Sequence, residues 1–384
     1  MGDPPLPRDQ FPVTARWAFF NHAGVAPIPR VTGDAVRRWA EETLLDGGLA
    51  STPQEAEAED VRAAAARLMG VPAADVAFVK NTTEGLGFVA NGIDWAPGDR
   101  VVVPDGEFPS TIYPWLALEG RGVVVDRVAP VGDTAALPVE AFAERISGGP
   151  PPRLVALSWV QFARGWRSDV AAIARLCREV GALVCVDVIQ GLGVIPCDLD
   201  AWGVDFAMAD AHKWLLGPSG CGVLYVRGER RDLLRPLEPG WNSVAHREEW
   251  DNLEVVWDDS ARRFEGGTLN LPGIMGLGAS IALLEETGID EIWAHVDALC
   301  GQVADGAAAL GAEVLSDRGD GRSSIVSIRF EGVRNRWLWE QLEQRGFAVV
   351  PRGRALRVSP HGYNSDEEVD RFLATVAELV RAAP

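Results

Sequence analysis

Residues 209–222 read ADAHKWLLGPSGCG and lie between two apolar runs, VDFAMA (204–209) and GVLYVR (222–227). The chain contains 36 lysines and arginines, but only Lys80 and Lys213 are lysines, so the other 34 (36 minus 2) are arginines. A guanidinium stays protonated, whereas the amine of a lysine can lose its proton and attack a carbonyl group. A lysine kept at position 213 of such a chain therefore indicates Schiff-base chemistry rather than a simple charge contact.

The sequence around this stretch alternates apolar runs with helix-like segments. DVRAAAARLMG (60–70), TTEGLGFVANGI (82–93) and VAAIARLCREVG (170–181) favour helices, and Thr82 stands where the second of them would be capped. Strands and helices in series predict a mostly parallel sheet that is covered on both faces. The predicted strands are 76–79, 100–104, 123–128, 153–160, 182–188, 204–209 and 222–227.

After about residue 228 the pattern changes to an irregular aromatic segment and then to a long helix at 273–288. The remaining sequence predicts helix, strand, helix, strand and helix, which is typical of a smaller α+β unit. We therefore expect an α/β fold with an N-terminal arm (1–20), a large domain (21–260) and a small C-terminal domain (261–384).

The composition argues against a nucleic-acid-binding, a membrane and a secreted protein. The net charge is −19, and a polyanion such as nucleic acid requires a basic surface, so nucleic-acid binding is not expected. The sequence has no run of 18 apolar residues and no basic region followed by an apolar run at its start, so we expect neither a membrane span nor a secretion signal. Five scattered cysteines without a CxxC pair predict reduced thiols in a cytoplasmic protein.

Two further segments favour pyridoxal phosphate as the partner of Lys213. Asp187 ends an apolar run in CVDVIQG, where a carboxylate can pair with a protonated ring nitrogen, and Gln190 follows three residues later. NTTEG (81–85) follows a predicted strand and combines hydroxyl groups with a helix start, which suits a phosphate.

Other site types are not supported by the sequence. It has neither GxxxxGK[ST] nor a GxGxxG after a strand, so a P-loop and a dinucleotide fingerprint are absent. GPSGC (217–221) has Cys221 where the hydrolase elbow GxSxG requires glycine. HxxxH spacing is missing as well, so no metal site is expected.

The motifs together resemble those of a known family. In chain order, TTEG (82–85), EFPS (107–110), VDVIQG (186–191), DAHKWLLGPSGCGVLYVR (210–227), GGTLN (266–270) and LRVSPHGYN (356–364) are similar to the class V aminotransferases. These are fold-type I pyridoxal-phosphate enzymes, a group that includes cysteine desulfurases, selenocysteine lyases, kynureninases and isopenicillin N epimerase. The resemblance covers about residues 20 to 380.

The resemblance implies a role for each matching residue. Lys213 would carry the cofactor as a Schiff base, Asp187 would pair with its ring nitrogen, and Gln190 would bond its ring oxygen. Arg357 would bind the substrate carboxylate through its two-pronged guanidinium. The other expected cofactor contacts are Thr82, Thr83, Phe108, Asp210, His212 and, from the second subunit of a homodimer, Thr268 in the loop 266–268; the other expected substrate contacts are His22, Gly24 and Asn242, with Trp115, Trp241 and His361 as further candidates.

The chain also departs from the family pattern. The stretch FAVVPRGRALRVSPH (347–361) has no cysteine where desulfurases carry their nucleophile, so a desulfurase with a thiol relay is not expected. Asp210 replaces a phosphate-binding serine, and a carboxylate that faces a phosphate would be repelled, so we expect Asp210 to point elsewhere or to bond a backbone amide. Phe108 replaces a stacking histidine, and VQF (160–162) stands where many members have asparagine.

These features predict an enzyme that joins the amine of an amino acid to the cofactor and removes the Cα proton. The favoured reaction is transamination. Elimination at Cβ, as in a C–S lyase or a kynureninase, is the next alternative, and epimerisation is the third. A protein that binds the cofactor as a sensor without catalysis is also considered. The substrate side chain is left open.

Overall fold

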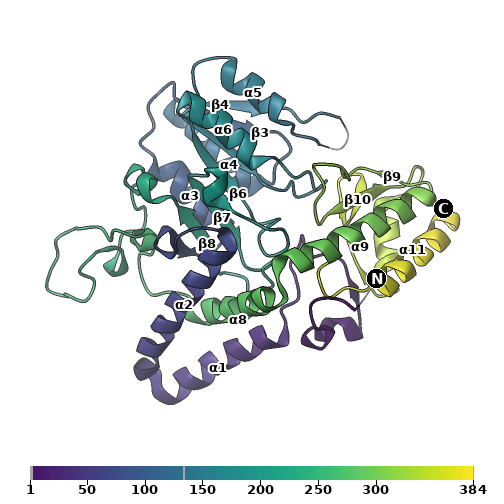
Figure 1. Ribbon diagram of the computed structural model, residues 1–384, viewed down its shortest axis with the longest axis horizontal. Coiled ribbons are helices and arrows are strands. Elements are labelled where there is room, and N and C mark those ends of the chain that lie inside the picture. The colour runs from purple at the N-terminus through teal and green to yellow at the C-terminus, as the bar shows by residue number, and fades with distance from the viewer. Residues whose placement is uncertain (1–2, 133–134, 384) are drawn as a thin grey trace.

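The computed structural model describes residues 3–132 and 135–383. Its largest sheet has seven strands in the order β2-β8-β7-β6-β5-β3-β4 (Figure 1). Strand β8 runs antiparallel to both of its neighbours, and the other pairings are parallel. The predicted mostly parallel sheet is therefore confirmed. Its strands are β2 (Val76–Val79), β3 (Arg100–Pro104), β4 (Val124–Val128), β5 (Leu154–Ser158), β6 (Leu183–Asp187), β7 (Phe206–Asp210) and β8 (Gly222–Val226).

The apolar runs of the central strands explain why both faces of this sheet are covered. Along β5, Leu154 and Ala156 belong to one buried hydrophobic cluster, whereas Val155 and Leu157 belong to another. Because successive side chains of a strand point to opposite faces, an uninterrupted apolar run requires cover on both sides. Residues of α3 (Thr82–Gly92) and α4 (Pro109–Leu116) complete the first cluster. The second cluster includes residues of α2 (Ser51–Met69), α5 (Val139–Ser147), α6 (Val170–Val180), α7 (Leu199–Trp202) and α8 (Leu271–Thr287).

Helix α3 begins one residue earlier than we expected. Asn81 is its N-cap, with an extended backbone and a side-chain oxygen that accepts a hydrogen bond from the backbone N–H of Glu84. An asparagine oxygen satisfies one of the N–H groups that have no partner within the helix. Thr82 is therefore the first residue of the helix, and its hydroxyl is not needed as a cap.

A smaller unit follows the large sheet in the chain. Its four strands have the order β12-β13-β10-β9, and all three pairings are antiparallel. Helix α11 begins with a capping box in which Ser365 and Glu368 bond each other's backbone N–H groups. The elements of this unit are β9 (Glu313–Val314), β10 (Val326–Arg329), β12 (Val350–Arg352), β13 (Ala355–Val358), α9 (Ile289–Ala309), α10 (Asn335–Gln344) and α11 (Asp366–Arg381).

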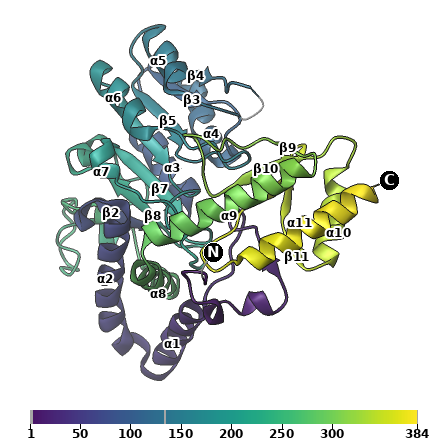
Figure 2. The same ribbon diagram turned by 45° about the vertical axis from the view of Figure 1, so that its right-hand side comes forward.

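Two segments pack against a different unit from the one that their place in the sequence predicts. Strand β1 (Ala18–Phe19) pairs in parallel with β11 (Phe347–Ala348), so the N-terminal segment lies against the small unit. Helix α8 packs against α1 (Arg30–Asp46) and α2, although it follows the expected boundary at residue 261 (Figures 1 and 2). The division into 1–20, 21–260 and 261–384 stays a prediction, and residues 1, 2, 133, 134 and 384 lie outside the described residues.

Within the described ranges, no helix combines the length and the hydropathy that crossing a bilayer requires.

Candidate active site

A cavity of about 340 Å³ lies at the carboxyl ends of three parallel strands. Ser158, Asp187 and Asp210 are the last residues of β5, β6 and β7, and all three line it. Ligands of α/β sheets bind at this edge, because the strand ends and the loops that follow them converge there. The lining residues are Ala23, Gly24, Val25, Asn81, Thr82, Thr83, Phe108, Ser110, Ser158, Val160, Phe162, Asp187, Ile189, Gln190, Asp210, His212, Lys213, Arg352 and Arg357.

Lys213 lies in a short loop between β7 and β8 whose backbone is tied down on both sides. The N–H of Leu216 donates to the carbonyl of Lys213 (3.0 Å), and the N–H of Gly217 donates to the carbonyl of Ala211 (2.9 Å). Leu216 has a φ of +56°, a conformation that is rare for a residue with a side chain. Such conformations persist where the surrounding structure enforces them, which is common at functional sites.

Burial makes the amine of Lys213 easier to deprotonate. The pKa of Lys213 falls to about 8, chiefly because burial disfavours the charged form, and Arg357 lowers it further. Asp187 acts in the opposite direction, because its negative charge favours the ammonium form. At pH 7 a pKa of 8 leaves about one amine in ten neutral, compared with about one in 3000 for an ordinary lysine.

Asp187 is fixed in place by two hydrogen bonds. One carboxylate oxygen accepts from the backbone N–H of Ile189 (3.0 Å), and the other accepts from the hydroxyl of Thr111 (3.1 Å). Burial raises the pKa of Asp187, and these two hydrogen bonds and Lys213 partly oppose the rise. A buried carboxylate of this kind gains from a cationic partner, which the protonated ring nitrogen of pyridoxal phosphate would supply.

Gln190 is held from two directions. Its side-chain amide donates to the carbonyl of Ala23 (3.1 Å), and its oxygen accepts from the indole N–H of Trp214 (3.0 Å). The amide has a second N–H, so one donor is left over for a ligand oxygen in the cavity. Trp214 follows Lys213 directly in the chain, and this bond therefore also fixes the position of the lysine relative to Gln190.

The N-terminus of α3 forms another wall of the cavity. Thr82 and Thr83 are its first residues, and the first N–H groups of a helix have no partner within the helix. The hydroxyl of Thr82 is buried and has no hydrogen-bond partner among the described residues. Backbone N–H groups, a free hydroxyl and the positive end of a helix favour a phosphate group.

Asp210 also lines the cavity, and the expectation that it points away from the phosphate or bonds a backbone amide stays a prediction. Its Oδ1 lies 2.8 Å from Nδ1 of His212 in a geometry that does not form a regular hydrogen bond, and neither atom has another partner among the described residues.

Together these groups fit pyridoxal phosphate from end to end. Lys213 supplies a neutralisable amine, Asp187 a partner for a ring cation, Gln190 a spare donor, and the start of α3 a phosphate site with the unpaired hydroxyl of Thr82. Such a group would give a hydrogen-bond partner to the unpaired hydroxyl of Thr82 and to the second N–H of Gln190.

Phe108 and Phe162 form an apolar wall. Their rings meet edge to face with centroids 5.4 Å apart, and Nζ of Lys213 lies 5.7 Å from the centroid of the Phe108 ring. Phe108 is 44% exposed, which leaves its ring available to a bound ligand. A phenyl ring can stack on a planar ring, but it has no acid or base to offer.

Arg357 lines the cavity from β13 of the small unit. It donates to the carbonyl of Phe162 (2.6 Å) and to the side-chain oxygen of Asn21 (3.2 Å). Burial and the neighbouring charge of Arg352 lower the pKa of Arg357 to about 9. Both arginines line the cavity, which gives this end a positive potential suited to a carboxylate.

Some predicted site residues lie elsewhere. His22 is fully buried, with its ring nitrogens 2.8 Å from the carbonyl of Ser359 and 2.8 Å from the hydroxyl of Tyr363, so its place differs from the expected substrate contact. Asn242 and Thr268 line another surface hollow. Trp115 and His361 are fully buried and do not line the cavity, and Trp241 lies with Asn242.

Sequence reasoning missed several residues of the cavity. Ser158 carries the signal of a polar residue at a strand end, which had also pointed to Asp187. Arg352 stands five residues before Arg357 in the same predicted segment, but an arginine-rich sequence gives such a residue no distinction. The other lining residues without a predicted role in the site are Ala23, Val25, Ser110 and Ile189, whereas Asn81, Val160 and Phe162 belong to segments that the sequence had already singled out.

No cysteine of the described residues lines the cavity. Four of the five thiols are buried, and burial raises the pKa of each of the five. A thiol nucleophile needs access and a low pKa. The expectation that the chain works without a thiol relay stays a prediction.

The chain is similar to a known protein family and to several of its named members. A family model described as "Aminotransferase class-V" matches residues 48–372. A protein named "Probable cysteine desulfurase" from Methanothermobacter thermautotrophicus is 32% identical over 292 residues, which is 75% of this chain and 72% of the relative. "Uncharacterized aminotransferase YcbU" from Bacillus subtilis is 31% identical over 312 residues, which is 81% of each chain.

Solved structures agree over the full chain. The structure of an apo cysteine desulfurase from Thermococcus onnurineus NA1 has a TM-score of 0.89 and 25% identity, with 100% of both chains covered. A complex of the cystine C-S lyase C-DES with its reaction product cysteine persulfide also has a TM-score of 0.89 and 25% identity, with 96% of this chain and 99% of that chain covered. The similarity in sequence, fold and cavity together shows that the chain belongs to the class V aminotransferase family and is a pyridoxal-phosphate-dependent enzyme of fold type I.

Proposed function

We propose that the chain removes the Cα proton of an amino acid with a single base, Lys213, and that the reaction is a transamination. The observation that carries this proposal is the composition of the cavity. Lys213 with its neutralisable amine, Arg357 and the ring of Phe108 line the same cavity, which supports a carboxylate contact for Arg357 and a stacking contact for Phe108. Transamination needs one base that takes a proton from one atom and returns it to another.

Each residue has a defined part in this proposal. Arg357 holds the substrate carboxylate through its guanidinium, which fixes the direction in which Cα points. Lys213 accepts the Cα proton on Nζ and later returns it at another carbon. The cofactor, when bound, supplies the electron sink that accepts the electrons left at Cα. Asp187 keeps the ring nitrogen protonated, which that sink requires, and Thr82, Thr83 and His212 hold the phosphate.

The apolar wall bears on the choice between reactions. Epimerisation requires a second acid or base on the opposite face of Cα, because the proton must return from the side that Lys213 does not reach. Phe108 and Phe162 offer no such group. His212, which also lines the cavity, lies beside Asp210. The wall therefore favours transamination over epimerisation.

A test follows the two products of one turnover. The enzyme loaded with pyridoxal phosphate is mixed with single L-amino acids and no acceptor. We expect one equivalent of 2-oxo acid per subunit and conversion of the cofactor to its amine form, followed by full recovery when a second 2-oxo acid is added. Repeated release of pyruvate and ammonia without an acceptor would reject transamination, and solvent deuterium at Cα with loss of chirality would favour epimerisation.

A Cβ–S lyase is the second candidate, because the chain is similar in structure to the cystine C-S lyase C-DES. A disulfide-bearing substrate that expels a persulfide would need no thiol from the protein, and no cysteine of the described residues lines this cavity. The same assay with L-cystine decides the matter, because a lyase releases pyruvate, ammonia and a persulfide in many turnovers. Release of sulfur from L-cysteine through a protein persulfide would contradict both candidates.

A further inference from the structure

The small unit presents two arginines to the cavity from one β-hairpin. Strands β12 and β13 pair antiparallel, with Arg352 opposite Ala355 and Val350 opposite Arg357. Residues two apart on a strand point to the same face, so Arg352 and Arg357 are diagonal neighbours on one face of the hairpin. Both line the cavity that contains Lys213.

Neither guanidinium has an acidic partner among the described residues. Arg357 bonds two neutral oxygens, those of Phe162 and Asn21, and its Nε is buried without a partner. Arg352 donates one long hydrogen bond of 3.4 Å, to the carbonyl of the adjacent Pro351. Two positive charges therefore lie near each other with nothing negative from the small unit to balance them.

The other buried arginines of the described chain show a different arrangement. Arg62 lies against Glu265, Arg263 against Asp232 (2.8 Å), and Arg100 at 3.7 Å from Asp126. A buried charge without a counter-charge is costly, so the fold provides a carboxylate in each of these three places. Arg357 is the fourth buried arginine and the exception, which indicates that its counter-charge comes from a ligand. Arg352 is half-buried, and it lines the same cavity without a carboxylate partner among the described residues.

The charges in the cavity allow two anions at this end. Asp187 and Asp210 lie at the strand ends that form the cofactor side, and Lys213 lies close to them. The α-carboxylate of an amino acid brings one negative charge, which Arg357 takes up under the proposed function. The carboxylate balances the charge of one guanidinium only. Arg352 would therefore remain without a counter-charge, and it would still be repelled by the neighbouring Arg357.

We propose that Arg352 binds a second acidic group, carried by the side chain of the substrate, so that the substrate is a short amino acid with two carboxylates. The inference rests on the proposed function, which assigns the α-carboxylate to Arg357. A guanidinium matches the planar, two-oxygen geometry of a carboxylate. The side chain is short because a cavity of about 340 Å³, at the low end for ligand sites, must also hold the cofactor.

Binding without turnover tests the proposal independently of the reaction. Calorimetry on the enzyme loaded with pyridoxal phosphate compares succinate with butyrate, which has the same number of carbons and one carboxylate. We expect succinate to bind at least about tenfold more tightly, as for one additional charged hydrogen-bonding pair. Arg352→Gln should reduce the affinity for succinate to that for butyrate. It should leave the affinity for butyrate within about twofold of the value in the unaltered enzyme.

Arg354→Gln is the matched control, since Arg354 lies in the exposed turn of the same hairpin and does not line the cavity. It should leave both affinities unchanged, and Arg352→Lys should recover part of the preference for succinate. If Arg352→Gln weakens the binding of succinate and of butyrate equally, both arginines bind the same carboxylate and the proposal is wrong. Equal affinities in the unaltered enzyme would also overturn it.

Steady-state kinetics test whether the second acidic group of the substrate also matters for catalysis. L-Aspartate should exceed L-asparagine in kcat/KM by about 10- to 100-fold, because the two differ in charge and hardly in shape. Arg352→Gln should remove most of this ratio. Turnover of neither amino acid, combined with tight succinate binding, would reject the proposed transamination but leave the second anion site intact. Turnover of both at equal rates would reject the second site alone.

Discussion

Burial and charge act in opposite directions on the amine of Lys213. Burial lowers its pKa, Asp187 raises it, and Arg357 and Arg352 lower it, so that the value comes to about 8. The neutral amine is the form that attacks a carbonyl, and its fraction increases with pH until the pKa is passed. The two arginines that we assign to the substrate therefore also help to keep Lys213 reactive.

This balance predicts how cofactor attachment depends on pH. When pyridoxal phosphate is added to the apoenzyme, the rate of attachment should increase with pH and reach a plateau just above about pH 8. Stopped-flow absorbance at the visible band of lysine-bound pyridoxal phosphate measures it. A rate that continues to increase beyond pH 10 would mean that Lys213 behaves as an ordinary exposed lysine.

At this scale the sequence predicted the residues whose type is unusual for their position. Lys213 stood out in an arginine-rich chain, and Asp187 and Gln190 followed an apolar strand, and all three line the cavity. Arg352 was missed because arginine is common in this chain, and its role depends on a strand register that composition does not show. His22 matched a motif, but its ring bonds inward to Ser359 and Tyr363.

At the scale of elements, the position of α3 on the sheet depends on a close approach at Gly85. A Cβ at Gly85 would lie 2.8 Å from the Cβ of Met208 on β7, so any side chain there would push the helix away. The N-terminus of the same helix carries Thr82 and Thr83. Helix packing on the sheet is thus coupled to the proposed phosphate site.

Gly85→Ala should therefore cost about 1–3 kcal/mol of unfolding free energy, as for an overpacked contact, and weaken binding of pyridoxal phosphate. Gly87→Ala is the control on the same helix, because a Cβ there meets nothing within 4 Å. That change should stabilise the protein by about 0.5–1 kcal/mol and leave cofactor affinity unchanged. Urea unfolding and cofactor titration measure both effects, and equal behaviour of the two variants would show that the close contact has no consequence.

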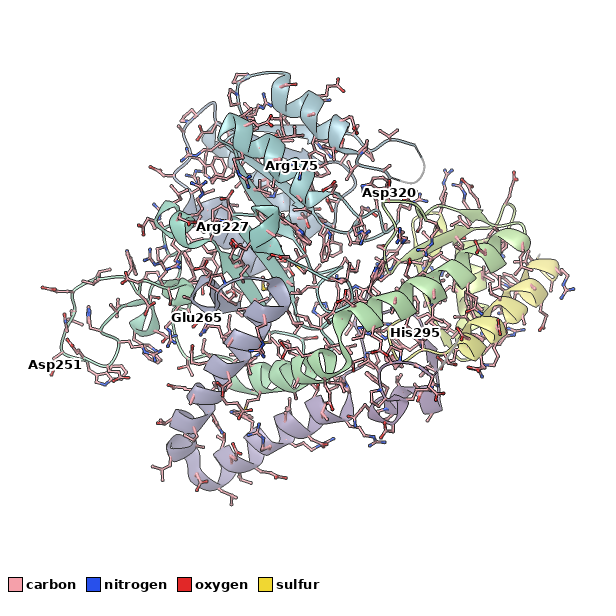
Figure 3. The ribbon with its side chains drawn as sticks, in the orientation of Figure 1. Arg175, Arg227, Asp251, Glu265, His295 and Asp320 are labelled. Carbon is pink, nitrogen blue, oxygen red and sulfur yellow. The ribbon has the colours of Figure 1, made fainter. Side chains whose placement is uncertain are left out.

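A second link between elements is the buried pair of Arg62 and Glu265. The carboxylate of Glu265 bonds Arg62 on α2 (3.0 Å to Nη2) and the backbone N–H of Phe78 on β2 (2.7 Å). Figure 3 places Glu265 at the left of the molecule, at the base of the long loop that carries Asp251. Since Gly266 follows directly, this pair anchors the start of the loop 266–268.

Arg62→Met leaves the fully buried carboxylate of Glu265 without its cation, and should cost about 3–5 kcal/mol of unfolding free energy. Arg67 lies on the same helix as Arg62, and Arg67→Met removes its ion pair with Glu285 on α8. The side chain of Arg67 is 60% exposed, so this change should cost less than about 1 kcal/mol of unfolding free energy. Denaturant unfolding of the two variants checks the difference. Similar losses in both would mean that burial does not govern these ion pairs.

The elements themselves were more predictable than their packing. The seven strands of the large sheet were found with ends shifted by at most two residues, because their apolar runs are long and bounded by turns. The reversed direction of β8 did not follow from its sequence, since an apolar run reads the same in either direction. Helix α1 was not among the predicted elements, and only Thr32 and Ala35 of this helix are buried.

At the scale of the whole molecule, the remaining proposal is a homodimer with shared sites. Thr268 lines surface hollows away from the cavity of its own chain, so it can serve a phosphate only in a second subunit. We expect sedimentation at twice the mass of the chain. Thr268→Ala should reduce the affinity for pyridoxal phosphate by about tenfold, as for one hydrogen bond to a charged group, while the dimer persists. An active monomer would contradict the shared site.

Lys213 is the residue on which the account depends, and the chain offers a matched control because Lys80 is its only other lysine. Lys80 is paired with Glu84 on the surface, 2.7 Å away. The enzyme loaded with pyridoxal phosphate is reduced with borohydride, which makes the link to lysine permanent, and its peptides are then mapped by mass spectrometry. We expect the pyridoxyl group on the peptide that contains Lys213, and none on the peptide that contains Lys80. Labelling of Lys80, or of neither lysine in a protein that still binds the cofactor, would contradict the account.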